Sequence, residues 1–192
     1  MSGVVAHAVD DAVFEILAAC ESMAGLPYDG EPVDQLEHAL QCAELARTES
    51  DDPEFVIACL LHDIARAPAV AGISYDASHE HHGEAGARWL EPRVGARIAW
   101  LAAQHVPAKR YLVATDPGYR AGLSEVSERT LRAQGGPMTG SEVKAFESQP
   151  DWRLAVALRT IDDRGKVPGA VVPSLEAYRG LLGRVVAARL AT

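Results

Sequence analysis

The stretch Leu60-Leu61-His62-Asp63-Ile64 places an adjacent histidine and aspartate at the end of an apolar helical segment. The residues before the pair, Val56 to Leu61, carry no charge and belong in a protein core. Burying an imidazole beside a carboxylate costs free energy unless another group compensates both, and a metal ion is one efficient compensation. The dipeptide alone also fits a helix end that surfaces into solvent, so its meaning depends on the other ligand-type residues.

Further side chains of the types that bind metals are spread along the chain. They are His38, His82, His105 and Asp162. Counted with His62 and Asp63, they make four imidazoles and two carboxylates, a set that suits Fe, Mn, Co or Zn rather than Cu(I) or an iron–sulfur cluster. A carboxylate can bridge two metals about 3.5–4 Å apart, which a histidine does not normally do. The pattern therefore predicts a two-metal site in which Asp63 is the bridging ligand.

Apolar residues recur at helical spacing along almost the whole chain, and strand-like alternation is nearly absent. This predicts an all-α fold, with one domain over residues 1–192 and about eight or nine helices in a bundle. The expected helices span residues 10–24, 34–47, 53–65, 82–90, 92–103, 124–133, 141–148, 150–167 and 174–191. Connectors rich in proline and glycine separate them, and residues 67–78 are expected to form a loop.

The composition limits the classes of function. Of 192 residues, 48% are hydrophobic and 23% charged, as in an ordinary globular domain. The formal net charge of -9 argues against a general nucleic-acid-binding protein, which needs clustered positive charge. No window approaches about 18 uninterrupted apolar residues, so we expect no membrane segment. No obligate protein partner is evident, which leaves a small molecule as the expected partner.

The three cysteines are Cys20, Cys42 and Cys59, and no two of them form a Cys-x-x-Cys pair. Each lies in an apolar helical segment, so we interpret them as buried free thiols. This suggests reducing, cytoplasmic surroundings. The N-terminal residues lack the basic start and apolar run of a signal peptide.

The order of the ligand-type residues resembles the HD-domain superfamily, and specifically its members with two metals. Other stretches look like the phosphonate-catabolism branch, typified by the mixed-valent diiron 2-amino-1-hydroxyethylphosphonate dioxygenase. These stretches are residues 105–112, 116–119, 123–124, 134–138 and 162–168. The similarity covers roughly residues 28 to 178 and implies a single HD-type helical domain with a metal-binding core at about 28–168.

The resemblance implies a ligand set for each of two irons. One iron would bind His38, His62 and Asp162, and the other His82 and His105, with Asp63 between them. Two of these ligands have a neighbour of the same type. His81 remains an alternative to His82, which we prefer because it opens a family-like His-Gly-Glu run, and Asp163 remains an alternative to Asp162.

The resemblance also implies residues that meet the substrate. Tyr28 and Glu31 match a loop pair; in the resembled enzymes the tyrosine occupies an open metal position at rest, and both residues move when substrate arrives. Lys109, Ser127 and Arg159 match residues that hold the phosphonate. Their types suit an anion, because lysine gives a point charge, serine a neutral donor and arginine a bidentate fork.

One position departs from the resembled enzymes. They typically carry a second histidine four residues after the histidine of the His-Asp pair, where this chain has Arg66. We interpret Arg66 as a further anion-binding residue, which favours a more highly charged substrate or indicates a different substrate altogether.

Together these residues imply a diiron dioxygenase with two iron ions (Fe2+/Fe3+) and O2 as cosubstrate. It would cleave the C–P bond of a 1-hydroxyphosphonate, or a related small hydroxylated anion, to a carboxylate and phosphate. The alternative is a metal-dependent phosphohydrolase, the commoner activity among HD proteins, using Mn or another divalent metal on a small phosphate ester or nucleotide. A third hypothesis is an idle HD module that binds a small anion, but the intact ligand set argues against it.

Overall fold

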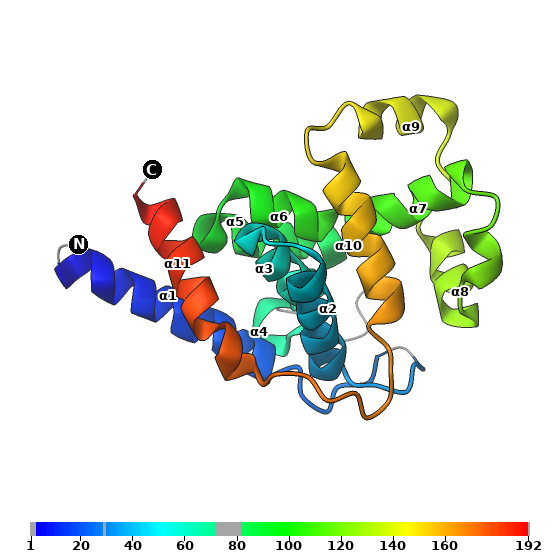
Figure 1. Ribbon diagram of the computed structural model, residues 1–192. Coiled ribbons are helices and arrows are strands. Elements are labelled where there is room, and N and C mark those ends of the chain that lie inside the picture. The colour runs from blue at the N-terminus through cyan, green and yellow to red at the C-terminus, as the bar shows by residue number, and fades with distance from the viewer. Residues whose placement is uncertain (1–2, 29, 72–81, 192) are drawn as a thin grey trace.

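The computed structural model describes residues 3–28, 30–71 and 82–191 (Figure 1). Over these residues the chain forms eleven α-helices and three short 3-10 helices, with no strand beyond an isolated bridge between Pro27 and Asp34. The all-α prediction is therefore confirmed, whereas the expected count of eight or nine helices is wrong.

The helices are numbered in the order in which the chain forms them. They are α1 (Gly3–Glu21), α2 (Gln35–Glu49), α3 (Pro53–Leu61), η1 (Ile64–Arg66), α4 (Pro68–Ala71), α5 (His82–Val94), α6 (Ala96–Ala103), α7 (His105–Thr115), η2 (Arg120–Gly122), α8 (Glu125–Ala133), α9 (Gly140–Glu147), α10 (Trp152–Arg164), η3 (Leu175–Tyr178) and α11 (Arg179–Leu190).

Two of the helices, α4 and α7, lie where none was predicted. α7 carries Pro107 as its third residue, and a proline there is tolerated because the N–H groups of the first turn have no partner within the helix. α4 is a single turn inside the stretch expected to be a loop. Both helices were absent from the set expected from the sequence.

The boundary between α5 and α6 also differs from the expected one. α5 continues through Pro92, which was expected to begin the next helix, and ends at Val94. The chain turns at Gly95, whose φ of 95° lies in the left-handed region that favours glycine. The break therefore comes from glycine and lies beyond the proline.

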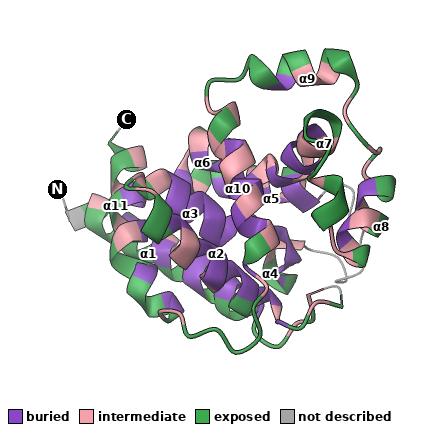
Figure 2. Ribbon diagram, turned by 45° about the vertical axis from the view of Figure 1, so that its right-hand side comes forward, coloured by how far each residue is buried: buried purple, intermediate pink, exposed green. Residues whose placement is uncertain are grey.

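α3 lies at the centre of the core. Its residues Phe55 to Leu61 are all buried, as expected for a helix that is apolar on every side (Figure 2). α2, α6, α10 and α11 pack around it. A smaller apolar cluster joins α7, α9 and α10 through Tyr111, Phe146 and Ala155. The end of α3, with the His-Asp pair, therefore projects from the buried centre of the core.

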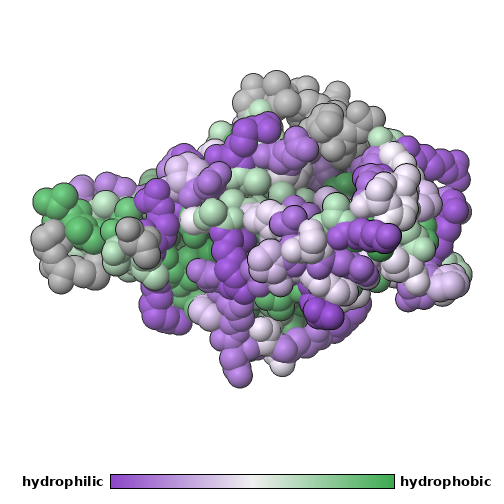
Figure 3. All heavy atoms as spheres, turned by 90° about the horizontal axis from the view of Figure 1, so that it is seen from above, coloured by the Kyte–Doolittle hydropathy of each residue, from purple (hydrophilic) through white to green (hydrophobic). Residues whose placement is uncertain are grey.

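The face drawn in Figure 3 is mostly polar. On the face drawn in Figure 3, hydrophobic atoms gather at the end where α1 begins, and Val4 and Phe14 of that helix are largely exposed. None of the described helices has both the length and the hydropathy to cross a membrane. The three cysteines are free and buried, which confirms the interpretation of them as buried thiols.

Candidate metal centre

Buried polar side chains concentrate in one region of the fold. Among the described residues, the buried polar and charged side chains are Gln35, Gln41 and ten of the twelve site residues predicted from the sequence. Desolvating so many polar groups costs free energy unless they compensate one another or a ligand does so. The predicted residues are thus brought together inside the protein.

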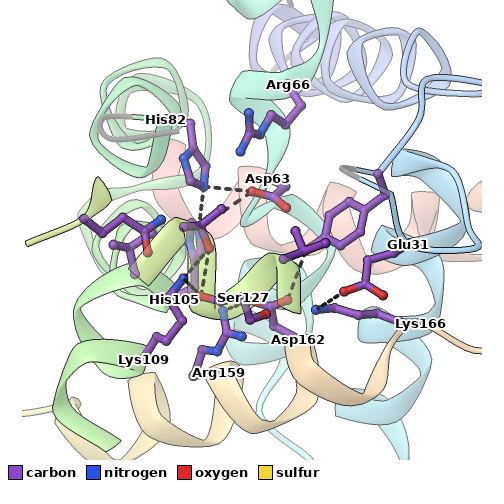
Figure 4. A pocket seen from close by; sticks show the side chains of 15 residues that line it. Glu31, Asp63, Arg66, His82, His105, Lys109, Ser127, Arg159, Asp162 and Lys166 are labelled. Atoms are coloured by element: carbon purple, nitrogen blue, oxygen red, sulfur yellow. Dashed lines mark hydrogen bonds and ion pairs between the residues drawn. The ribbon is translucent and has the colours of Figure 1, made fainter. Parts of the chain in front are cut away.

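A small pocket of about 50 Å³ opens onto this region (Figure 4). Ten of the predicted site residues line it: Tyr28, Glu31, Asp63, Arg66, His82, His105, Lys109, Ser127, Arg159 and Asp162. The other two, His38 and His62, are buried next to it, and each makes contact with a lining aspartate. The lining comes from segments far apart in the sequence.

The chain changes direction at the His-Asp pair. α3 ends at Leu61, and His62 still has helical dihedral angles. Asp63 leaves the helical region, with φ -103° and ψ 16°, and its carbonyl accepts a hydrogen bond from the N–H of Arg66 at 2.8 Å. Because of this turn, Leu61 stays in the core while the carboxylate of Asp63 reaches the pocket.

His38 and His62 form the first pair of facing imidazoles, with 3.1 Å between their Nε2 atoms. Nδ1 of His38 lies 2.9 Å from the carbonyl of Gly165, and Nδ1 of His62 lies 2.8 Å from the carbonyl of Cys59. Because a carbonyl only accepts, each Nδ1 carries the proton and each Nε2 of the neutral ring presents a lone pair. Two lone pairs this close repel unless a cation lies against them.

His82 and His105 form the second pair, with 2.7 Å between their Nε2 atoms. Nδ1 of His105 lies 2.7 Å from the carbonyl of Ala102, so the same argument leaves its Nε2 as a lone pair. Asp63 lies between the two pairs. One of its oxygens is 3.2 Å from Nε2 of His82, and the other is 3.6 Å from Nε2 of His62.

Burial favours the uncharged form of two of these imidazoles, those of His38 and His105. It lowers the pKa of His38 to about 4 and that of His105 to about 3. Burial also acts to raise the pKa of Asp162, but the Arg159 guanidinium outweighs it and holds that pKa well below its ordinary value. Neutral imidazoles and ionised carboxylates are the protonation states that metal binding requires. The donor set therefore fits metal ions.

Asp162 lies beside the first pair of imidazoles, His38 and His62. Its Oδ1 lies 3.4 Å from Nε2 of His38 and accepts a hydrogen bond from the hydroxyl of Tyr28 at 3.2 Å. The Tyr28 ring stacks on the His38 ring, with 4.1 Å between centroids. Cys42 Sγ lies 3.8 Å from Nδ1 and 3.7 Å from Nε2 of that ring. Since the sulfur is almost equally near both nitrogens, it is directed at neither of them and packs against the ring.

The pocket is cationic on the side opposite Asp63. Nζ of Lys109 donates to Thr130 Oγ1 at 2.8 Å, beside the Ser127 carbonyl. Burial, followed by the charge of Arg159, lowers the pKa of Lys109 to about 7. Arg159 is buried and lines the same side. Two cations and a serine thus face the imidazole pairs across a cavity that has room for a small anion.

The comparisons with known proteins agree with this geometry. The family model described as "HD domain" matches residues 36–134, just over half of the chain. The chain belongs to the HD-domain family.

Two relatives of this HD-domain protein are named as dioxygenases of phosphonates. [1-Hydroxy-2-(trimethylamino)ethyl]phosphonate dioxygenase (glycine-betaine-forming) of Leisingera caerulea is 38% identical over 83% of this chain and 82% of its own length. Hydroxymethylphosphonate dioxygenase of Gimesia maris is 41% identical over 80% of this chain and 78% of its own length. Uncharacterized protein L432 of a mimivirus is 32% identical over 87% and 78% of the two chains. The resemblance drawn from the sequence is thereby confirmed.

The two alternatives for ligands have different outcomes in this HD-domain protein. Asp163 does not face the imidazoles; it pairs with the guanidinium of Arg159. Asp162 is therefore the carboxylate that the structure places beside His38. His82 lies in the pocket, whereas its competitor His81 falls outside the described residues, so the preference for His82 stays a prediction.

Sequence reasoning missed Lys166, which also lines the pocket. Its Nζ lies 3.6 Å from the carboxylate of Glu31 and 5.5 Å from the ring centroid of Tyr28. Glu31 also accepts a hydrogen bond from Ser124 Oγ at 2.8 Å. Lys166 belongs to the stretch 162–168 that carries the family resemblance, but no pattern in that stretch indicates that Lys166 meets a loop so distant in the sequence.

Proposed function

We propose that this HD-domain protein is a non-haem diiron dioxygenase that cleaves the C–P bond of a small 1-hydroxyphosphonate. The reaction would use O2 and give a carboxylate and phosphate. The observation that carries the proposal is the pair of facing imidazole sets with Asp63 between them, beside a cationic cavity. The relatives named as phosphonate dioxygenases support the same class of activity.

The candidate metal ligands fall into two groups, one for each iron. His38, His62 and Asp162 would hold one iron, and His82 and His105 the other, with the two oxygens of Asp63 directed to the two groups. Bound iron would supply the electron transfers and the activation of O2 that protein side chains do not provide. The backbone carbonyls of Gly165, Cys59 and Ala102 fix the ring orientations.

The remaining residues bind and enclose the substrate. Lys109 and Arg159 attract the phosphonate, and the hydroxyl of Ser127 adds a neutral donor. Tyr28 and Glu31 cover the pocket, since Tyr28 reaches Asp162 and Glu31 reaches Ser124. Because Lys109 and Arg159 are buried, solvent screens their attraction for an anion less than it would at the protein surface.

Arg66 adds a third cation at another part of the wall. It is buried, and its guanidinium points into the pocket beside Asp63 and His82 (Figure 4). A cavity this small with cations on two sides suits a compact substrate without a positive substituent. Hydroxymethylphosphonate, which the name of the Gimesia maris relative specifies, is the compound of that kind to test first.

The test is anaerobic loading with iron followed by addition of O2 and hydroxymethylphosphonate. The balance of the reaction requires one phosphate and one formate for each O2 consumed. A second sample, half-reduced, is measured by electron paramagnetic resonance for a coupled Fe(II)/Fe(III) signal that changes on adding the phosphonate. The matched control is Asp63→Asn, which removes the charge between the imidazole pairs.

A hydrolase predicts the opposite pattern. It would release phosphate from p-nitrophenyl phosphate with Mn2+ and without O2. The dioxygenase proposal fails if O2 is not consumed with any of a panel of 1-hydroxyphosphonates while ester hydrolysis is rapid.

A further inference from the structure

Asp163 is next to the candidate ligand Asp162 but has a different partner. Both of its oxygens pair with Arg159: Nε donates to Oδ2 at 3.1 Å, and a terminal nitrogen donates to Oδ1. The proposed metal centre has no use for Asp163 as a ligand. Its pairing nevertheless occupies one edge of a guanidinium that is almost completely buried.

Tyr119 joins the same edge from another part of the chain. Its hydroxyl donates to Oδ2 of Asp163 at 2.5 Å and accepts from Nε of Arg159 at 3.0 Å. Tyr119 lies in the turn between α7 and α8, where its own N–H reaches the carbonyl of Asp116 and Gly118 N–H reaches the Asp116 side chain. The hydroxyl is therefore presented from a turn with its own hydrogen bonds.

The other edge of Arg159 faces Asp162. A terminal nitrogen donates to Oδ2 of Asp162 at 2.7 Å. The second oxygen, Oδ1, is left to face Nε2 of His38 at 3.4 Å and the Tyr28 hydroxyl. Arg159 thus binds one oxygen of the Asp162 carboxylate, and the other oxygen points towards the pair of His38 and His62.

The planarity of the guanidinium connects its two edges. Because Nε and the terminal nitrogens lie in one plane, contacts on the edge with Asp163 and Tyr119 decide where the nitrogen that meets Asp162 lies. Without them, Arg159 would be free to turn and to take both oxygens of Asp162. Asp162 would then bind a metal ion less tightly, because arginine would hold both of its oxygens.

We propose that Tyr119 and Asp163 are positioning residues, which hold Arg159 so that it takes one oxygen of Asp162 and leaves the other for a metal ion. This inference rests on the proposed role of Asp162 as a ligand. Groups that orient metal ligands typically contribute about 10–100-fold to metal affinity. The positioning role also explains the turn at residues 116–119, which has no other part in the proposed reaction.

The test is a titration of the full chain with Mn2+, in which the electron paramagnetic resonance signal measures the concentration of unbound Mn2+. Tyr119→Phe and Asp163→Asn should each weaken binding of one of two Mn2+ ions by about tenfold or more, and leave the other ion unaffected. The control is Tyr178→Phe, which removes a tyrosine hydroxyl that contacts Glu44 at 3.4 Å away from the pocket. That variant should bind as the unmodified chain does.

A double-mutant cycle separates positioning from general structural damage. In an Arg159→Met background, Tyr119→Phe should have no further effect on Mn2+ affinity, because it acts only through Arg159. Thermal unfolding of each metal-free variant shows whether folding is intact. If Tyr119→Phe lowers that stability, Asp163→Asn, which hardly changes volume, carries the test.

Each result has one meaning. If the unmodified chain binds no Mn2+, the proposed metal centre itself is wrong. If the unmodified chain binds two ions and both variants bind them with the same affinity, the metal centre stands and the positioning role is overturned. An effect of Tyr119→Phe that persists in the Arg159→Met background also overturns it.

Discussion

The carbonyl of Gly165 accepts a hydrogen bond from Nδ1 of His38 at 2.9 Å, at the point where α10 ends against α2. This bond keeps the proton on Nδ1 and turns Nε2 towards His62. The approach is close enough that a side chain at position 165 has no room. A Cβ atom there would lie 2.5 Å from Sγ of Cys42 and 3.4 Å from Nδ1 of His38.

We therefore expect Gly165→Ala to disturb the metal centre by steric contact alone, since φ at this residue is -74° and alanine adopts it without strain. The free energy of unfolding should fall by about 1–3 kcal/mol, and one bound metal per chain should be lost. Metal analysis and thermal unfolding measure the two effects. Adding Cys42→Ala should restore both, because it removes the sulfur.

Gly183→Ala is the matched control for that substitution. Gly183 lies within α11, and a Cβ atom there meets nothing within 4 Å. Alanine in a helix interior is favoured over glycine by about 0.5–1 kcal/mol. This variant should therefore be slightly more stable with unchanged metal content. Equal behaviour of the two glycine variants would contradict the steric argument.

Asp63 is expected to support both metals, because its two oxygens face different imidazole pairs. Asp63→Ala should leave fewer than one tightly bound metal per chain. Asp10→Ala, which removes an exposed carboxylate of α1 away from the pocket, should retain two. Metal content after gel filtration, measured by mass spectrometry, distinguishes them. Retention of two metals by the Asp63 variant would show that this residue does not bridge.

Anion binding is expected to depend on pH through Lys109, whose pKa burial lowers to about 7. A lysine with that pKa is charged below pH 7 and becomes neutral above it. Affinity for hydroxymethanesulfonate, whose charge does not change in this range, should therefore fall as pH rises from 6 to 8. In Lys109→Met the same titration by calorimetry should be flat. A flat profile in the unmodified chain would remove Lys109 from the anion site.

The sequence was sufficient to predict which side chains gather around the pocket, because a potential ligand is recognised by its residue type. Histidine and aspartate can bind metals wherever they lie in a fold. The order of these residues around the His62-Asp63 pair was enough to identify the candidate ligands. The tautomers were not predictable, since they depend on carbonyls such as that of Gly165, which tertiary packing brings to His38.

The same distinction holds for the fold. Helical periodicity identified the all-α class. The predicted helix boundaries were wrong at prolines, because proline is found both at the start of a helix and within one. Pro92 lies inside α5, although it was expected to begin the next helix, and Pro107 lies inside the first turn of α7, which was not predicted. The expectation of one domain over the whole chain stays a prediction, as do the catalytic roles.

Lys166 illustrates what only the structure supplies, and its contacts lead to a specific expectation. It pairs with Glu31 and lies over Tyr28, so Lys166→Met should loosen the loop that covers the pocket. A mostly buried ion pair of this kind contributes about 1 kcal/mol, which corresponds to roughly a fivefold rise in KM. Metal content should not change, because no predicted ligand contacts Lys166 in an ion pair. The control is Lys144→Met, on the exposed side of α9, which should leave KM as it was. A fall in kcat at constant KM would instead mean that Lys166 acts on the reacting atoms and not on the loop.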